Sequence, residues 1–272
     1  MKKRVISIAG LSALFSAAAL ATPAMTVLTV NTGDPMAYAE WTKSSGEAIA
    51  KSVGAGVGGI CLASGGYYKP GELYYWHLFD SHASAMGANS YNKTVMSELK
   101  KLPVDRVVNR SDVYSVVMPS EGNYKRGDTF ANWNVVVETD QPAAYMSGLQ
   151  RMQAAAAANG FGDISFTGYS YQTGPETGNM MVVVQGPSGE RVGAFLDQTN
   201  SSWSAPIMAE FSDMRKLKHG FTMNCEVVYS ALSINARCGS EDPQLFHRSL
   251  DLEFHRLGST EGLLSPQEAL NV

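Results

Sequence analysis

A short motif that occurs twice is the feature of this sequence that most constrains its fold. Residues 30–38 read VNTGDPMAY and residues 137–145 read VETDQPAAY, so Val, Thr, Pro, Ala and Tyr recur in the same register. An apolar run typical of a β-strand precedes each copy, and an apolar pattern with helical spacing follows each. Because a repeat of this kind marks a repeated structural unit, the sequence predicts one module written twice.

Both copies of the motif carry the signals of a helix start. Pro35 and Pro142 suit the first helical turn, where a residue without an N–H group loses no hydrogen bond. Asp34 precedes the first helix and Asp140 or Thr139 precedes the second, and these side chains can accept hydrogen bonds from the first free N–H groups. Each copy is therefore expected to pass from a strand directly into a helix. The glycines that we expect to end the two helices are Gly54 and Gly160.

The elements after the helix also follow one order in both copies. A strand, a turn, a returning strand, a broken helical region and a last strand complete the ferredoxin-like order β-α-β-β-α-β, an antiparallel sheet with helices on one face. We predict an α+β fold of two tandem modules, residues 22–121 and 122–238, followed by a C-terminal extension, residues 239–272. The predicted strands are 27–30, 58–64, 73–79 and 107–118 in the first copy and 133–137, 163–171, 179–185 and 222–232 in the second, with broken helical regions at 82–101 and 188–216.

This element order, with its repeated strand–proline–helix junction, resembles the dimeric α+β barrel superfamily, whose familiar small members are similar to antibiotic-biosynthesis monooxygenases. The resemblance covers about residues 26–232. It implies that two ferredoxin-like sheets pack into one barrel within the chain, so that an oligomer is not required. It also implies a cofactor-independent or haem-dependent monooxygenase as an alternative function. Some haem-degrading relatives use an Asn on the first strand, a Trp on the third and a His on the second helix, and Asn31, Trp76 and His82 lie in comparable elements.

The N-terminus is typical of a secretory signal peptide. Residues 1–4 (MKKR) are basic, residues 5–21 are uncharged and mostly apolar, and cleavage is expected after Ala21 or, second, after Ala24. The apolar run is shorter than the roughly 20 residues that a membrane-spanning helix needs. We therefore expect an exported, periplasmic or secreted protein that is not inserted in the membrane after cleavage.

The charge of the chain excludes one class of partner. The sequence has 21 Lys and Arg against 25 Asp and Glu, a formal net charge of −4. Removal of residues 1–21 takes away three basic residues and no acidic one, which moves the charge to −7. An acidic protein without a basic run does not attract nucleic acid through its overall field, so no nucleic-acid partner is expected.

Three cysteines, Cys61, Cys225 and Cys238, are available for pairing in an oxidising compartment. Cys225 and Cys238 flank an apolar, strand-like run, and we predict a disulfide between them. Cys61 lies in the apolar segment Gly-Ile-Cys-Leu-Ala and is expected to be a buried, unreactive thiol. The C-x-x-C spacing of many metal sites does not occur in the sequence.

The residue types best suited to chemistry lie around the third predicted strand and the helix after it. Alternation along this strand sends Trp76 and His77 to opposite faces of the sheet. The candidate catalytic residues are His82, His77 and Asn31. As metal ligands the two histidines have only Asp80 beside them, so no metal site is predicted. The alternative is that Trp76 packs in the core while the histidines cap a helix or face solvent.

A glycine-rich segment at residues 54–59 (GAGVGG) matches the G-x-G-x-x-G pattern of dinucleotide-binding loops. Such a loop has to follow a strand and precede a helix, so that the phosphates meet the helix N-terminus. Here the segment follows a predicted helix and precedes a strand. We therefore interpret it as a helix end and a turn, and expect no nucleotide cofactor.

Aromatic residues gather in the first copy, and strand side chains that face a barrel interior could line a pocket. The candidate ligand-binding residues are Trp76, Tyr74, Tyr38 and Trp41. The leading hypothesis is an exported protein that binds a small apolar or aromatic ligand, mainly in the first module, without a cofactor. The alternatives are the monooxygenase, with haem as the alternative cofactor, and a non-catalytic envelope module that binds another protein.

Overall fold

The computed structural model describes residues 21–120 and 124–231, which form eight strands and six helices. The predicted signal peptide up to residue 20, the predicted module boundary at 121–122, the C-terminal extension and Cys238 lie outside the described residues. The strands are β1 (Ala24–Thr32), β2 (Val57–Gly65), β3 (Glu72–Phe79), β4 (Arg106–Met118), β5 (Thr129–Glu138), β6 (Ser165–Tyr171), β7 (Met180–Gly186) and β8 (Lys216–Ser230). The helices are α1 (Pro35–Val53), α2 (His82–Gly87), α3 (Lys93–Leu99), α4 (Pro142–Ala158), α5 (Gly189–Leu196) and α6 (Ala205–Met214).

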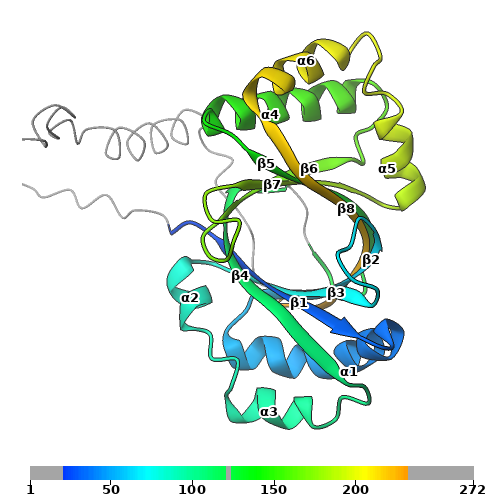
Figure 1. Cartoon of the computed structure of the whole chain (residues 1–272). Helices are drawn as coiled ribbons and strands as arrows, with labels where there is room; N and C mark the ends of the chain where they lie inside the picture. Colours follow the sequence, from blue (N-terminus) through cyan, green and yellow to red (C-terminus); the bar gives the residue numbers. More distant parts are fainter. Residues whose placement is uncertain (1–20, 121–123, 232–272) are drawn as a thin grey trace, which may run out of the picture.

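The strands form one closed barrel in the order β1-β3-β2-β8-β5-β7-β6-β4, and every neighbouring pair is antiparallel. Within the two halves the order is β4-β1-β3-β2 and β8-β5-β7-β6. The halves meet at two seams, β2 with β8 and β4 with β6. Helices α1 to α3 lie outside the first half and α4 to α6 outside the second, on opposite sides of the barrel (Figure 1). The prediction of an α+β barrel is confirmed.

Local signals place the first helix as predicted, but not the cap of its counterpart. Oδ1 of Asp34 accepts a hydrogen bond from a backbone N–H of the first turn at 3.0 Å, and Pro35 begins α1. In α4 the cap position is occupied by Gln141, and no side chain makes a capping hydrogen bond. The prediction that Asp140 or Thr139 caps this helix is therefore wrong. Instead, Oγ1 of Thr139 accepts a hydrogen bond from the N–H of Gln141 in the turn ahead of the helix.

The two broken helical regions contain two short helices each, as expected, and the largest boundary difference lies after the second. Strand β8 begins at Lys216, the residue at which the helical region was expected to end, rather than at residue 222. Its whole first part pairs with β5, down to Lys216 opposite Glu138. Pairing with a neighbouring strand thus extends β8 beyond its own apolar run. None of the helices in residues 21–120 and 124–231 is long and apolar enough to cross a membrane.

A buried tyrosine anchors the first helix of each half. Tyr38 of α1 and Tyr145 of α4 are fully buried. The hydroxyl of Tyr38 accepts a hydrogen bond from Nη1 of Arg106 at 3.0 Å, and that of Tyr145 accepts one from Nη1 of Arg215. Arg106 begins the last strand of the first half, and Arg215 immediately precedes the last strand of the second. Burial raises the pKa of both hydroxyls, so both stay neutral.

Removal of either hydroxyl is expected to have a similar, modest effect. Tyr38→Phe and Tyr145→Phe each delete one hydrogen bond and leave behind a half-buried arginine that water still reaches, so each should lower the free energy of unfolding by about 1 kcal/mol. Since the two tyrosines belong to separate core clusters, the double variant should lose the sum. Urea denaturation of the three variants measures these values. A loss in the double variant far above the sum would contradict the independence of the two contacts.

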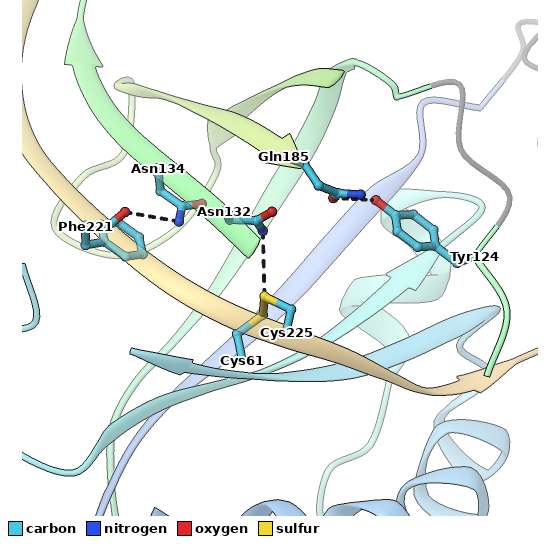
Figure 2. The surroundings of a disulfide bond; sticks show 7 residues. All are labelled: Cys61, Tyr124, Asn132, Asn134, Gln185, Phe221 and Cys225. Atoms are coloured by element: carbon cyan, nitrogen blue, oxygen red, sulfur yellow. Dashed lines mark hydrogen bonds between the residues drawn. A yellow bond between two sulfur atoms is a disulfide. The ribbon is translucent and has the colours of Figure 1, made fainter. Parts of the chain in front are cut away.

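A disulfide crosses the seam between β2 and β8 (Figure 2). Cys61 lies directly opposite Cys225 in the strand register, and their sulfur atoms are bonded within the barrel interior. The prediction of a disulfide between Cys225 and Cys238 is therefore wrong, as is the prediction that Cys61 is a free thiol. The physical reason is barrel closure, which places two residues 164 positions apart in the sequence side by side.

Three layers of core side chains result from this architecture. One cluster fills the barrel interior with residues of both halves, and two others lie between the sheet and the helices of each half. Trp76 belongs to the interior cluster. His77 points to the helix side, where its ring packs edge-on against Tyr75 at a centroid distance of 4.6 Å. The prediction that Trp76 and His77 face opposite ways is confirmed.

Candidate functional site

A cavity of about 200 Å³ lies at one end of the barrel. It occupies the end at which β1 finishes and β3 begins, and we call this the cavity end. Thr29, Tyr74 and Arg110 from the first half line it together with Tyr171 and Phe221 from the second. The pocket that the sequence places mainly in the first module is therefore shared by both halves.

Aromatic rings line the cavity in a row. Tyr68 stacks on His219 with centroids 4.4 Å apart and ring planes 20° from parallel. His219 in turn stacks on Phe221 at 5.4 Å, and Tyr74 follows at 5.3 Å from Phe221. Tyr171 also lines the cavity, and burial raises the pKa of its hydroxyl to about 12. Flat rings of this kind suit a flat aromatic ligand.

Two hydrogen-bonded pairs place charged groups at this end, where Lys69 and Glu176 also line the cavity. The hydroxyl of Tyr74 donates to the carboxylate of Glu72, which is buried at 4% exposure. Nε of Arg110 donates to Oδ2 of Asp112, which is completely buried beside the cavity. Burial raises the pKa of Asp112, although the guanidinium of Arg110 opposes that shift. Arg110 and Asp112 thus form an ion pair without net charge.

Several polar groups of the cavity wall have no protein partner. Nε2 of His219 and Oγ1 of Thr29 are buried and make no hydrogen bond within the described part of the chain. Nη1 and Nη2 of Arg110 likewise donate to no acceptor among residues 21–120 and 124–231. A buried polar atom without a partner costs about 1–3 kcal/mol. These are the atoms whose hydrogen-bonding capacity a bound molecule would satisfy.

The size of the cavity limits its ligand. At about 200 Å³ it is smaller than the roughly 300–1,000 Å³ of pockets for drug-sized molecules. It exceeds the roughly 150 Å³ that suffice to hold benzene in an engineered apolar cavity. The cavity therefore has room for a single ring with one or two small substituents.

The four predicted ligand-binding residues do not form one site. Tyr74 lines the cavity. Trp76 also faces the barrel interior but packs further along β3, with its ring 6.0 Å from that of Tyr124. Tyr38 and Trp41 lie on the other side of the sheet, in the core beneath α1, where Nε1 of Trp41 donates to a carbonyl oxygen of α3 at 3.1 Å. The sheet separates these two residues from the cavity.

The three candidate catalytic residues are also apart. Asn31 lies near the rim of the cavity end, where its side chain accepts a hydrogen bond from Asn109, a residue of the cavity wall. His77 is buried on the helix side, and burial lowers its pKa to about 4. His82 begins α2, with Nε2 2.8 Å from Oγ of Ser115. No single substrate could meet all three.

Haem, the alternative cofactor, does not fit the cavity or the surroundings of His77. The cavity of about 200 Å³ is too small for a tetrapyrrole. On the helix side no room is left beside His77, since a Cβ at Gly58 would already lie 2.9 Å from its ring. Within the described ranges, no group of three or more His, Cys, Asp or Glu side chains could hold a metal ion.

Sequence reasoning missed Arg110, His219 and Phe221. For Arg110 the available signal was the alternation along residues 107–118, which places Arg110 and Asp112 on one face of β4. His219 and Phe221 lie ahead of residue 222, where the last strand was expected to begin, so alternation along the predicted strand did not cover them. That signal assigns faces but not neighbours. Only the strand order brings β4 and β8, far apart in the sequence, to the same barrel cavity.

Comparison with known proteins gives a fold likeness and no sequence match. The sequence matches no protein-family model and no curated protein. A candidate monooxygenase from Lactobacillus acidophilus NCFM superposes with a TM-score of 0.52 and 11% identity, over 76% of this chain and 95% of that chain. A second candidate monooxygenase, from Fusobacterium nucleatum subsp. nucleatum, superposes with a TM-score of 0.51 and 10% identity, over 77% of this chain and 94% of that chain.

The likeness extends over both halves of the barrel, because the aligned three quarters of this chain exceed either half alone. At such low identity it bears on the fold and not on the reaction. It agrees with the closed strand order, with the helices outside the barrel and with the resemblance seen in the sequence. This chain therefore shares with these two structures the fold of a closed α+β barrel.

Proposed function

We propose that this chain is an exported protein that binds a small, neutral, hydroxylated aromatic molecule in the cavity at the barrel end. The observation that carries the proposal is the pairing of a row of stacked rings with unpartnered polar atoms around a space of about 200 Å³. The rings would stack on the ligand. The polar atoms would take its hydroxyl groups.

A phenolic hydroxyl matches the groups on offer. It can donate a hydrogen bond to Nε2 of His219 and accept a hydrogen bond from the terminal nitrogens of Arg110. Thr29 Oγ1 is available for a second substituent. A ring without a polar substituent would leave all of these groups unsatisfied, so an apolar ligand fits less well than the sequence-based hypothesis assumed.

Tandem duplication is part of the same proposal. The strand order β4-β1-β3-β2 recurs as β8-β5-β7-β6, and the Tyr38–Arg106 contact recurs as Tyr145–Arg215. Both observations support two ferredoxin-like modules that together close one barrel. Because the second module supplies five of the twelve residues that line the cavity, the site needs no second chain.

Export is supported by the basic and apolar N-terminus of the sequence and by the disulfide. Disulfides persist in oxidising compartments such as the periplasm and are rare in the cytosol. Mass spectrometry of the protein purified from the periplasm tests this part: a mature N-terminus after residue 21 or 24 is the expected result. An intact N-terminus in a cytosolic fraction would contradict it.

Binding is tested by calorimetric titration with phenol and with cyclohexanol, which carries the hydroxyl on a ring without a π face. Because stacking contributes about 0.5–1.5 kcal/mol per aromatic pair, phenol should bind about tenfold more tightly. Because a ligand with few atoms binds weakly, the titrations have to reach millimolar ligand concentrations. Phe221→Ala removes the centre of the ring row and should lower phenol affinity by at least a similar factor.

The matched control is Phe130→Ala. Phe130 belongs to the same barrel-interior cluster and is equally buried, but it packs against Tyr124 and does not line the cavity. Both variants should lose similar stability, whereas only Phe221→Ala should lose ligand. Equal effects on phenol affinity, or no phenol heat with the unchanged protein, would refute the proposed site.

A second candidate function is cofactor-independent oxygenation of the bound phenol to a quinone. In this reaction one atom of O2 joins the ring, the other leaves as water, and the phenol itself supplies the electrons. It is favoured by the fold likeness to two candidate monooxygenases and by Nε2 of His219, which could take the proton of the phenolic hydroxyl. An oxygen electrode tests it: His219→Gln should abolish oxygen uptake while phenol still binds. Phenol binding without any oxygen uptake would contradict the oxygenation function and would be consistent with binding as the only function of the cavity.

A further inference from the structure

Asp112 is a completely buried carboxylate next to the cavity. Its Oδ2 accepts the hydrogen bond from Nε of Arg110, while Oδ1 has no partner in the described part of the chain. Gly174, in the loop between β6 and β7, packs directly on this second oxygen, because a Cβ at that position would lie 2.1 Å from Oδ1. A residue without a side chain thus lets the loop cover the carboxylate.

This burial makes the charge of Asp112 dependent on Arg110. Desolvation raises the pKa of Asp112, and the neighbouring guanidinium acts in the opposite direction. Arg110 is the cation that pairs with Asp112, and the two charges cancel as a unit. The hydrogen bond from Nε of Arg110 to Asp112 also fixes the orientation of the guanidinium. The two terminal nitrogens of Arg110 remain available to a ligand.

We propose that Asp112 sets the ligand class of the cavity: by cancelling the charge of Arg110, it makes the cavity select neutral hydroxylated rings over ring carboxylates. This inference rests on the proposed function, since it concerns the ligand of the same cavity. An uncompensated guanidinium would form paired, charge-assisted hydrogen bonds with a carboxylate. With Asp112 in place, Arg110 can still donate a hydrogen bond to a hydroxyl oxygen of the ligand. A ligand carboxylate adds little binding energy, because Asp112 already balances the charge of Arg110. Asp112 lies behind the wall, so it acts as a specificity residue through Arg110.

The test compares phenol with benzoate, which share a ring and differ in charge, by calorimetric titration of the mature protein at pH 7. The unchanged protein should bind phenol more tightly than benzoate. Asp112→Asn keeps the size of the side chain and leaves Arg110 uncompensated. Benzoate affinity should then rise about 10- to 100-fold, the range for hydrogen bonds to charged groups, and the preference should reverse.

Two controls separate this role from a general effect of charge. Asp163→Asn removes the carboxylate of another Arg–Asp ion pair, which Asp163 forms with Arg191 outside the cavity lining, and should leave the preference unchanged. The double variant Arg110→Met/Asp112→Asn removes both charges and should return benzoate affinity to its original level. Should Asp112→Asn fail to fold by circular dichroism, Asp112→Ser carries the same expectation.

The outcomes distinguish the inference from the proposed function. A merely structural Asp112 would weaken the binding of phenol and of benzoate together in Asp112→Asn, and that result would overturn the inference. An equal gain of benzoate affinity in Asp163→Asn would overturn it as well. Absence of phenol binding to the unchanged protein would contradict the proposed function. In that case a gain of benzoate affinity in Asp112→Asn would still support the cancellation of the Arg110 charge by Asp112, and no gain would overturn it.

Discussion

Cys61→Ala is expected to lower the free energy of unfolding by about 3–5 kcal/mol, because the disulfide that it removes closes a loop of 164 residues between β2 and β8. Loop closure restricts the unfolded chain, and the effect grows with loop length. Cys225→Ala should show the same loss. Urea denaturation of the oxidised protein measures both, and addition of a reductant to the unchanged protein should reproduce the result.

Cys238→Ala is the control for this prediction. Cys61 and Cys225 are already bonded to each other, so replacing Cys238 should leave the urea denaturation midpoint unchanged. The opposite pattern, a loss with Cys238→Ala and none with Cys61→Ala, would instead support the pairing expected from sequence. Peptide mapping under non-reducing conditions identifies the bonded pair directly.

Acidification from pH 7 to pH 4.5 is expected to lower the free energy of unfolding of the unchanged protein by about 2 kcal/mol more than that of the His77→Phe variant. Burial lowers the pKa of His77 from 6.5 to about 4 in the folded protein, while the unfolded chain keeps the ordinary value. Between these two values the unfolded state binds a proton that the folded state does not. The contribution is therefore present above pH 6.5 and is lost as the pH falls toward 4.

Urea midpoints of both proteins at several pH values measure the difference, since all other titrating groups are shared. Phe79→Leu serves as a matched control, because it disturbs a ring 6.3 Å from His77 and keeps the histidine. Its acid dependence should follow that of the unchanged protein. Parallel pH curves for the unchanged protein and His77→Phe would contradict a neutral, buried His77.

Local physics accounts for the part of the fold that the sequence predicts. Pro35 and Asp34 fix the start of α1 because they act within a single turn. Alternation along β3 separates Trp76 from His77 because neighbouring side chains of a strand point to opposite faces. The sequence places the start of β8 at residue 222 instead of Lys216, because the pairing of this strand with β5, and not its own composition, decides where it begins.

The candidate site was only partly predictable for a related reason. Tyr74 and Trp76 share the inward face of β3, yet only Tyr74 lines the cavity. Alternation gives the face of a residue and not its depth along the barrel axis. His219 and Phe221 come from the other half and enter the site through the strand order, which no local pattern encodes.

The sequence by itself determined the order of the elements, the repeat and the opposite faces of Trp76 and His77, because all three arise from interactions over a few residues. The tertiary structure alone decided that Cys61 pairs with Cys225 and that Arg110, Asp112 and His219 meet at one barrel end. These contacts depend on which strands adjoin and in which register when the barrel closes. Closure is set by the packing of the whole chain, so its partners cannot be derived from any segment of it.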